Sequence, residues 1–273
     1  MRKVLVLWLV CIWIAVLITG CSPAQEEKTE IIIFAAASLQ ETLTELAEQY
    51  MAVHEDVRIV MNFDSSGTLK TQIQEGAECD IFISAGQKQM DQLDITADPE
   101  FNMQGLDFLL PETRINLLEN QIVLVVPEGN PGRVRSFEEL AVRMGNGEGI
   151  LAMGNADVPA GQYGSKILAY YGLAESELAA GGVITYSANV KEVVVQVQEA
   201  MVDCGIVYKT DAYSAGLAVV DEATPEMCGQ VIYPAAVLKT SPEREAAASF
   251  LAYLTSDTAD SVFREVGFTP IGE

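Results

Sequence analysis

The feature that most constrains the fold is an alternation of short apolar runs with amphipathic helical patterns. Residues 30–37 (EIIIFAAA) form an almost unbroken apolar run, which is typical of a strand buried on both faces of a parallel sheet. Apolar residues then recur at helical spacing over residues 39–50. Runs at 57–63 and 80–84, with a helical segment at 69–75 between them, complete a β-α-β-α-β order. This order predicts an α/β fold with a parallel sheet.

The second half of the chain repeats the pattern and predicts a second lobe. Its expected strands are residues 121–127, 149–153, 183–186 and 204–208, and a run at 230–238 is interpreted as a strand that crosses back. We therefore expect two lobes, each a mostly parallel sheet flanked by helices. Lobe I comprises residues 30–120 with 228–273, and lobe II comprises residues 121–227.

The first twenty residues are interpreted as a lipoprotein signal peptide. Arg2 and Lys3 precede an apolar run of about 15 residues, shorter than the roughly 20 that a membrane-spanning helix needs. The run ends in ITGC, which resembles a bacterial lipobox with cleavage before Cys21 and lipid on its sulfur. Two acyl chains on Cys21 would hold the protein to a membrane on its extracytoplasmic side, with residues 21–29 as a polar tether. The alternative is an ordinary signal peptide or signal anchor with a chance cysteine.

Charge and composition exclude several classes of function. Against 16 Lys and Arg stand 39 Asp and Glu, a formal charge of −23, and so acidic a surface repels a nucleic-acid backbone. Loss of Arg2 and Lys3 with the signal peptide leaves 14 of the 16 basic residues and shifts the charge from −23 to −25. The sole histidine, His54, removes most triad and multi-histidine metal designs. Since the chain also lacks a phosphate-binding loop motif, we expect no enzymatic activity.

Three cysteines remain in the mature chain besides Cys21. Cys79, Cys204 and Cys228 form no C-x-x-C pair, so neither a disulfide framework nor a zinc site is expected. We interpret all three as small buried apolar residues, with a Cys204–Cys228 bridge as the alternative.

Serines and helix starts gather where the predicted strands end. Ser38 and Ser66 each follow the carboxyl end of a strand, and Ala160 and Val190 fall in the first turns of two further helices. The first turn of a helix has N–H groups without intrahelical partners and a partial positive charge, so it binds anions. In open α/β sheets, ligands bind beyond the carboxyl ends of the strands. Four such ends facing one cleft would bind a small oxyanion.

Each of these signals also has a purely structural interpretation. Serine is common at helix N-caps, and Ser38 with Glu41 forms a Ser-x-x-Glu capping box. Asn189 with Glu192 is a similar capping pair. A purely structural surface lipoprotein is thus one alternative, and no single residue of the set indicates a binding site.

Taken in order, these segments resemble one family. AAASL at 35–39, SSGTL at 65–69, DIFISA at 80–85, VPAGQY at 158–163 and GIVY at 205–208, with Gly267-Phe268 near the end, are similar to the molybdate-binding proteins of bacterial molybdate ABC transporters. The resemblance extends from Glu30 to the C-terminus. It implies a type II periplasmic-binding-protein fold, in which two α/β lobes surround a cleft.

The resemblance also implies a set of site residues and partners. The oxyanion would be held by the hydroxyl and N–H groups of Ser38 and Ser66, by the backbone N–H groups of Ala160 and Val190, and by the Tyr208 hydroxyl. The chain departs from the family pattern at two places. Gly67 replaces the third member of the family's usual serine triplet, which leaves Ser65 and Ser66 as alternative donors. The loop before Pro159 is one residue shorter than in the family. The protein would be a monomeric receptor without a cofactor, which binds molybdenum only as the oxyanion and delivers molybdate or tungstate to an ABC permease.

The chemistry of the ligand leaves other anions open. Molybdate and tungstate are fully deprotonated near neutral pH and need only donors, whereas phosphate carries a proton and benefits from a carboxylate acceptor. Asp64 and Asp157 lie near the predicted site, and we interpret them as a turn residue and a loop residue, because a carboxylate beside a buried dianion is costly. The main alternative is the same fold binding sulfate, phosphate or a small organic anion.

Overall fold

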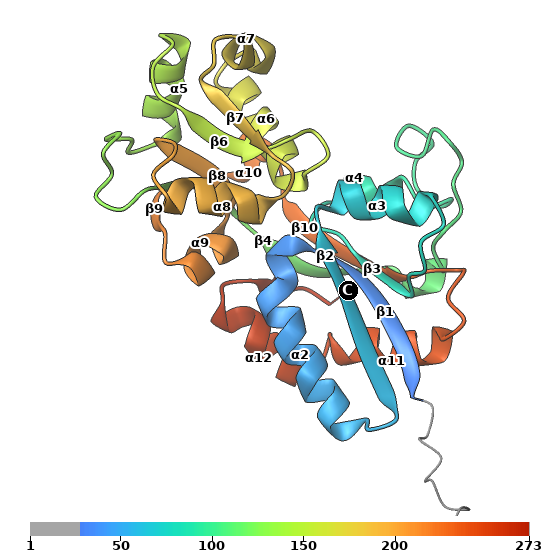
Figure 1. The fold of residues 1–273 in the computed structure, drawn as a ribbon. Coiled ribbons are helices and arrows are strands. Elements are labelled where there is room, and N and C mark those ends of the chain that lie inside the picture. Colours follow the sequence, from blue (N-terminus) through green and yellow to red (C-terminus); the bar gives the residue numbers. More distant parts are fainter. Residues whose placement is uncertain (1–27, 273) are drawn as a thin grey trace, which may run out of the picture.

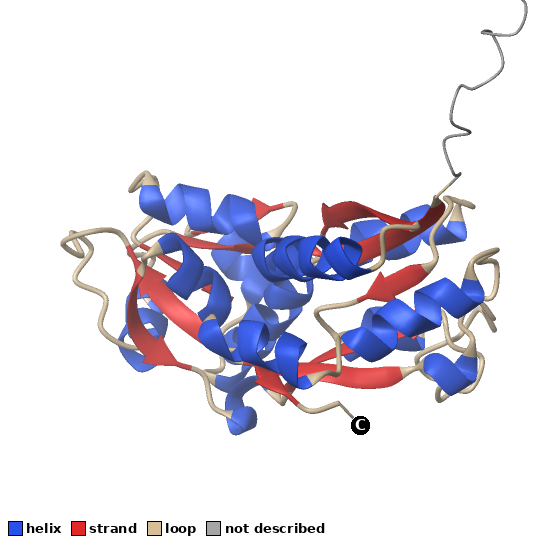
Figure 2. Cartoon of the chain, turned by 90° about the horizontal axis from the view of Figure 1, so that it is seen from below, coloured by secondary structure: helices blue, strands red, loops and turns tan. Residues whose placement is uncertain are grey.

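The structure is a computed structural model that describes residues 28–272. The predicted signal peptide, Cys21 and most of the predicted tether lie outside the described residues. Two sheets, each flanked by helices, form two lobes that lie side by side (Figure 1). Figure 2 shows the same layers from below, with helices packed around the strands of both lobes.

The first lobe is built on a six-stranded sheet whose order is β11-β4-β10-β3-β1-β2. Its strands are β1 (Thr29–Ala36), β2 (Val57–Asp64), β3 (Ile81–Ile83), β4 (Ile115–Asn120), β10 (Val231–Val237) and β11 (Thr269–Pro270). β1 pairs in parallel with β2 and β3, so that Ile33 lies opposite both Met61 and Ile81. The helices of this lobe are η1 (Ala37–Leu39), α2 (Gln40–Val53), α3 (Ser66–Gln74), α4 (Gln87–Asp91), η2 (Pro111–Thr113), α11 (Arg244–Tyr253) and α12 (Asp257–Glu265).

The second lobe is built on a five-stranded sheet whose order is β7-β6-β8-β5-β9. Its strands are β5 (Ile122–Val126), β6 (Leu151–Gly154), β7 (Ile184–Ser187), β8 (Cys204–Tyr208) and β9 (Ala218–Glu222). Its helices are α5 (Phe137–Gly145), α6 (Pro159–Tyr170), α7 (Glu175–Ala180), α8 (Val190–Gln198), α9 (Lys209–Ala215) and α10 (Pro225–Cys228). The chain passes between the two sheets twice, from β4 to β5 and from α10 to β10.

The two-lobed α/β class is confirmed, but the sheets are mixed rather than mostly parallel. Parallel pairing joins β1 to β2 and β3 in the first lobe, and β6 to β7 and β8 in the second. The strands next to the crossings, β5 and β10, run antiparallel to both of their neighbours. The sequence analysis missed β4 and β9, because polar residues interrupt their apolar patterns (INLLEN and AVVDE).

Side-chain caps fix the starts of two helices at the cleft. Ser65 Oγ accepts the Thr68 N–H at the start of α3, at 3.2 Å. The Asn189 side chain accepts the Glu192 N–H at the start of α8, at 3.1 Å, which confirms that predicted capping pair.

The predicted capping box of Ser38 with Glu41 is wrong. The N-cap of α2 is Leu39, and no side chain caps this helix. A turn of 3-10 helix, η1, places Ser38 upstream of the cap, and its hydroxyl bonds to Tyr233 instead. Ser38 is therefore free of the structural role that most often explains a serine at a helix start.

The cysteines behave as buried apolar residues. Cys79, Cys204 and Cys228 are all free and buried, which confirms their interpretation and rules out the Cys204–Cys228 bridge. Burial raises the pKa of all three thiols. Between residues 28 and 272, no helix is long and apolar enough to span a bilayer, and no three or more His, Cys, Asp or Glu side chains gather into a metal site.

Candidate functional site

A small cavity lies between the lobes, where β1 and β2 end and α3 and α8 begin. Its volume is about 10 Å³, far below the ~300–1,000 Å³ of pockets for drug-sized ligands. Four of the five predicted ligand-binding residues line it: Ser38, Ser66, Val190 and Tyr208. The other lining residues are Ala36, Ala37, Asp64, Ser65, Ala85, Val158 and Pro159. In this arrangement of the lobes the cavity has room for about one water molecule, so a tetrahedral anion would need its walls to move apart.

A larger hollow of about 740 Å³ lies at the opposite end of β1, beside Glu30 and Asp80. The most buried polar group there, the Asp80 carboxylate, already accepts the Ile32 N–H at 2.7 Å and the Ser241 hydroxyl at 2.6 Å. This hollow also lies away from the strand ends at which α/β sheets bind ligands. We therefore take the smaller, interlobe cavity as the candidate site.

A chain of buried hydrogen bonds orients Ser38. Its Oγ lies 2.9 Å from Tyr233 Oη, which in turn accepts a hydrogen bond from Asn120 Nδ2 at 3.2 Å. Asn120 Oδ1 accepts the Gln121 N–H at 2.8 Å, so the amide NH₂ group faces Tyr233. Either hydroxyl can be the donor of the bond between Ser38 and Tyr233. When Tyr233 donates, the Ser38 proton can be donated into the cavity.

Ser65 and Ser66 have different partners, and this separates their roles. Ser65 Oγ caps α3 and also lies 2.9 Å from Thr68 Oγ1. Ser66 Oγ accepts the Ala85 N–H at 2.9 Å, and within residues 28–272 its own proton has no acceptor. Ser66 is therefore the better donor of the two.

Tyr208 reaches across the cleft from β8. Its buried ring lies 5.5 Å from the Tyr233 ring, in a T-shaped arrangement, and its hydroxyl donates to the Ala85 carbonyl at 3.2 Å. Burial raises the pKa of both tyrosines well above the usual value, so both hydroxyls keep their protons. The Tyr208 proton points at Ala85 in this arrangement and would have to turn to reach a ligand.

Two helix starts face the cavity or adjoin it. Val190 is the first residue of α8 and lines the cavity. Ala160 is the second residue of α6 and is fully buried; it is not itself a lining residue, although its neighbours Val158 and Pro159 are. The N–H groups of Val190 and Ala160 lie in first turns, where they have no intrahelical acceptor. The partial positive charge of each helix start is thus available beside the cavity.

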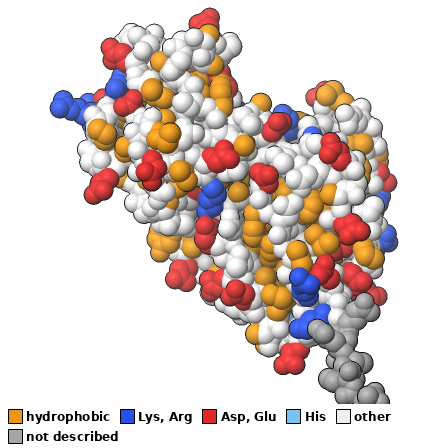
Figure 3. Space-filling view, viewed as in Figure 1, with side chains coloured by type: hydrophobic (Ala, Val, Ile, Leu, Met, Phe, Trp, Pro, Cys, Tyr) orange, Lys and Arg blue, Asp and Glu red, His pale blue; other side chains and the backbone are white. Residues whose placement is uncertain are grey.

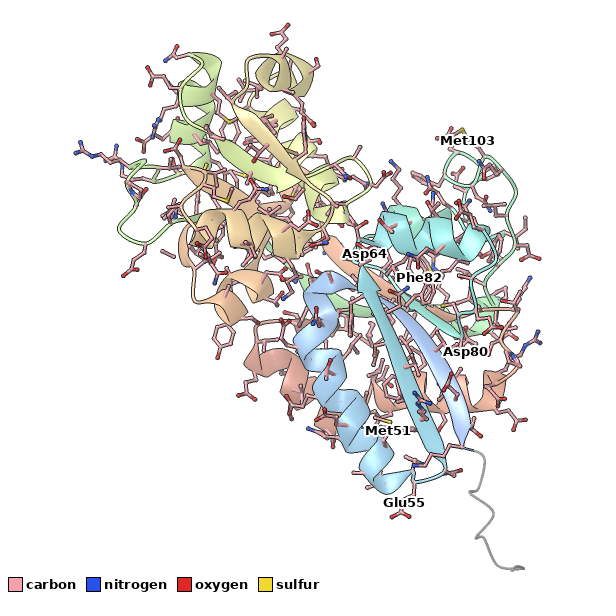
Figure 4. All side chains as sticks on the ribbon, viewed as in Figure 1. Met51, Glu55, Asp64, Asp80, Phe82 and Met103 are labelled. Atoms are coloured by element: carbon pink, nitrogen blue, oxygen red, sulfur yellow. The ribbon has the colours of Figure 1, made fainter. Side chains whose placement is uncertain are left out.

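The two aspartates near the predicted site differ in position. Asp64 ends β2, is half-buried and lines the cavity, at the end of the strand that faces the second lobe (Figure 4). Its Oδ1 accepts the Ser65 N–H at 2.7 Å. Asp157 is exposed and does not line the cavity. Asp64 thus both lines the cavity and accepts the N–H of the next residue, as expected for a turn residue.

The lobes touch at Gly67, one residue after Ser66. The Gly67 N–H donates to the Asp157 carbonyl of the second lobe at 3.1 Å. A Cβ at Gly67 would lie 2.2 Å from that carbonyl oxygen and 2.8 Å from Asp157 Cβ. A serine at this position would therefore prevent the approach of the lobes seen here, which gives a physical reason for the glycine.

Two residues that orient the site were missed in the sequence analysis. Tyr233 lies on β10 and Asn120 ends β4, so both stand next to the crossings between the lobes. Asn120 Nδ2 also donates to Thr210 Oγ1 at 3.0 Å. The one available signal was Tyr233 itself, which stands inside the apolar run 230–238. A tyrosine in a buried strand needs a hydrogen-bond partner for its hydroxyl group.

All lining side chains that carry polar hydrogens are neutral, and no Lys or Arg lines the cavity. Figure 3 shows Asp and Glu side chains spread over both lobes, with few basic ones among them. An anion in this cavity would thus be held by hydroxyl and N–H groups, with Asp64 as the charged group in the wall.

Comparison with known proteins gives consistent matches over nearly the whole chain. Residues 31–269 match the sequence profile of the family described as bacterial extracellular solute-binding protein. YvgL of Bacillus subtilis, provisionally named an ABC transporter substrate-binding lipoprotein, is 35% identical over 259 residues, 93% of each chain. The molybdate-binding protein ModA of Haemophilus influenzae is 31% identical over 267 residues, 93% of this chain and 96% of its own. These matches confirm the resemblance noted in the sequence.

Solved structures support the fold. The periplasmic molybdate-binding protein of Azotobacter vinelandii superimposes with a TM-score of 0.73 at 23% identity, over 88% of this chain and 98% of its own. The two-lobed arrangement is therefore that of periplasmic binding proteins.

We expect Gly67→Ala to disfavour the closed arrangement of the lobes, because the added Cβ collides with the Asp157 carbonyl. Small-angle X-ray scattering should give a larger radius of gyration than for wild type, with little change in the thermal midpoint. Gly145→Ala is the matched control, since a Cβ there meets only Leu173 Cδ2, at an ordinary 3.8 Å. Equal radii for wild type and Gly67→Ala would contradict the prediction.

Proposed function

Because the chain belongs to the family of bacterial extracellular solute-binding proteins, we propose that it is the molybdate and tungstate receptor of an ABC transporter. The observation that supports this best is the pair of serine hydroxyls from different strand ends, Ser38 and Ser66, which both line the cavity. Ser66 Oγ accepts the Ala85 N–H, and Ser38 Oγ can accept the Tyr233 hydroxyl, which leaves both serine protons for one ligand. A fully deprotonated tetrahedral dianion needs donors on every oxygen, and these two hydroxyls would supply two of them.

We also propose how the ligand is held and delivered. The Ser38 and Ser66 groups of the first lobe, and the N–H groups of Ala160 and Val190 with the Tyr208 hydroxyl of the second, would contact the anion together. A ligand that contacts both lobes binds the closed form selectively, so binding shifts the population towards closure. The closed receptor then docks on a permease as a monomer, carries out no catalysis, and stays at the membrane through lipid on Cys21.

The direct test is thermal unfolding of residues 22–273 with millimolar molybdate, tungstate, sulfate or phosphate. A ligand at about a thousand times its Kd adds roughly 4 kcal/mol of stability. In a chain of this size that raises the midpoint by on the order of 8–16 °C. We expect such a shift with molybdate and tungstate and none with sulfate or phosphate. No shift with any of the four anions would refute the proposed function.

Ser38→Ala should weaken molybdate binding by about 10- to 100-fold, since a hydrogen bond to a charged group contributes roughly 1.5–3 kcal/mol. Isothermal titration calorimetry measures the change, and circular dichroism checks the fold. Ser65→Ala is the control, because its hydroxyl serves the cap of α3. An unchanged Kd in Ser38→Ala would remove Ser38 from the site.

A second candidate ligand, phosphate, is favoured by one observation, the Asp64 carboxylate in the cavity wall. A carboxylate repels a full dianion but accepts a hydrogen bond from an oxyanion that keeps a proton. Phosphate near neutral pH is such an anion. The same two-lobed fold and the same serine donors would serve it equally well.

Asp64→Asn separates the two ligands, because it removes the charge and keeps an oxygen that can accept the Ser65 N–H. In a molybdate receptor the variant should bind molybdate roughly threefold to tenfold more tightly, through loss of a like charge near the anion. In a phosphate receptor it should bind phosphate at least about tenfold more weakly. Calorimetric titration of both anions into both proteins decides between them.

A further inference from the structure

A bidentate ion pair joins the two lobes at the rim of the cavity. Lys191, in the first turn of α8, places Nζ 2.9 and 2.8 Å from the two carboxylate oxygens of Glu41, in the first turn of α2. Lys191 directly follows Val190, and Glu41 lies three residues after Ser38. Across the cleft α8 packs against η1, so the pair lies beside residues of both lobes that line the cavity (Figure 1).

The same ammonium group is anchored inside its own lobe by Asp211 of α9. Nζ lies 3.1 Å from Asp211 Oδ1, and the Asp211 side chain is 0% exposed. This contact is within ion-pair distance, yet neither Asp211 oxygen accepts a well-formed hydrogen bond from residues 28–272. Lys191 therefore provides the charge that compensates this carboxylate.

A carboxylate buried in this way disfavours its own ionised form. Burial raises the pKa of Asp211 to about 6, an effect that Lys191 opposes and Glu41 reinforces. Tyr208 and Tyr233 also face Asp211, and both are uncharged. A buried, poorly bonded charge costs stability, so the arrangement needs a reason other than stability. Asp211 contacts Lys191 Nζ and so holds this side chain beside Glu41, at the edge of the cleft.

We propose that Lys191 is a closure latch, anchored in the second lobe by Asp211, whose ammonium group binds Glu41 of the first lobe in the closed form and slows release of the anion. When the lobes part, Lys191 keeps Asp211 and loses Glu41. The Lys191–Glu41 ion pair thus exists only in the closed form. An interaction made in only one form shifts the equilibrium between open and closed lobes. Only the identity of the released anion rests on the proposed function.

Lys191 does not act in this scheme as a positive charge for the ligand. With Glu41 and Asp211 both ionised, the three groups carry a net charge of −1. Nor is Lys191 among the residues that line the cavity. Its role is that of a positioning residue, and the tests below separate this role from anion binding and from plain structural support.

Glu41→Gln removes the partner in the first lobe and leaves Lys191 and Asp211 in place. We expect molybdate to dissociate about 2- to 5-fold faster, and to bind correspondingly more weakly, as for the loss of one partly exposed ion pair. The thermal midpoint of the ligand-free protein should stay unchanged. Glu45→Gln is the matched control, since Glu45 lies on the same helix and accepts a hydrogen bond only from Gln49 within residues 28–272.

Lys191→Met tests the anchor, and its effect on stability should depend on pH. The variant leaves Asp211 buried without a countercharge, so the thermal midpoint should fall at about pH 7.5 and much less at about pH 5, where Asp211 binds a proton. The sign follows from a folded pKa of Asp211 above the unfolded value: protonation favours the folded state, and this contribution is lost as the pH rises through the folded pKa, which is about 6 in wild type and is raised further when Lys191 is removed. The double variant Lys191→Met with Asp211→Asn should recover the midpoint while anion release stays fast.

Scattering of the ligand-free protein keeps the latch testable whatever the anion is. Glu41→Gln should enlarge the radius of gyration relative to wild type and Glu45→Gln. If wild type binds none of the four anions, the proposed function fails, and the scattering result alone decides on the latch. If Glu41→Gln has the same anion dissociation rate and the same radius of gyration as wild type, the latch is overturned. Normal release of anion by the double variant would overturn it as well.

Discussion

The hydrogen bond between Ser38 and Tyr233 joins η1, the turn of 3-10 helix after β1, to β10, the strand that returns from the other lobe. Tyr233 also accepts a hydrogen bond from Asn120, which ends β4, the strand from which the chain first leaves this lobe. Both crossings between the lobes therefore contribute a side chain to the orientation of one hydroxyl. The lobe rotation proposed for ligand binding would therefore act on the same two segments that orient Ser38.

Much of this arrangement could be predicted from local patterns, and the limits are physical. The run CGIVY predicts β8 with its correct bounds, because a strand buried on both faces is continuously apolar. The positions of Ser66 and Val190 at helix starts also follow from local signals. The partnership of Ser38 with Tyr233 joins residues 195 positions apart, and the contact of Gly67 with Asp157 depends on how two lobes meet. No periodicity within one element reports either contact.

A chain with a formal charge of −23 would be an unexpected receptor for an anion, and the distances involved resolve the difficulty. Charges on the surface are screened beyond about 8 Å at physiological salt. The hydroxyl and N–H groups of the cavity act at contact distance, where the field of remote carboxylates is weak. Asp64 is the exception, because it lies in the wall itself. Under the proposed function, selectivity among oxyanions would thus depend on one nearby carboxylate far more than on the total charge.

The three buried thiols have a consequence for how the protein is made. Cys79, Cys204 and Cys228 are unbridged, and their raised pKa values leave little thiolate to react. No covalent link therefore joins distant segments in the described part of the chain, and none has to form during folding. The fold of the described residues therefore needs no oxidant to be complete, and burial of the three thiols protects them once the chain has folded.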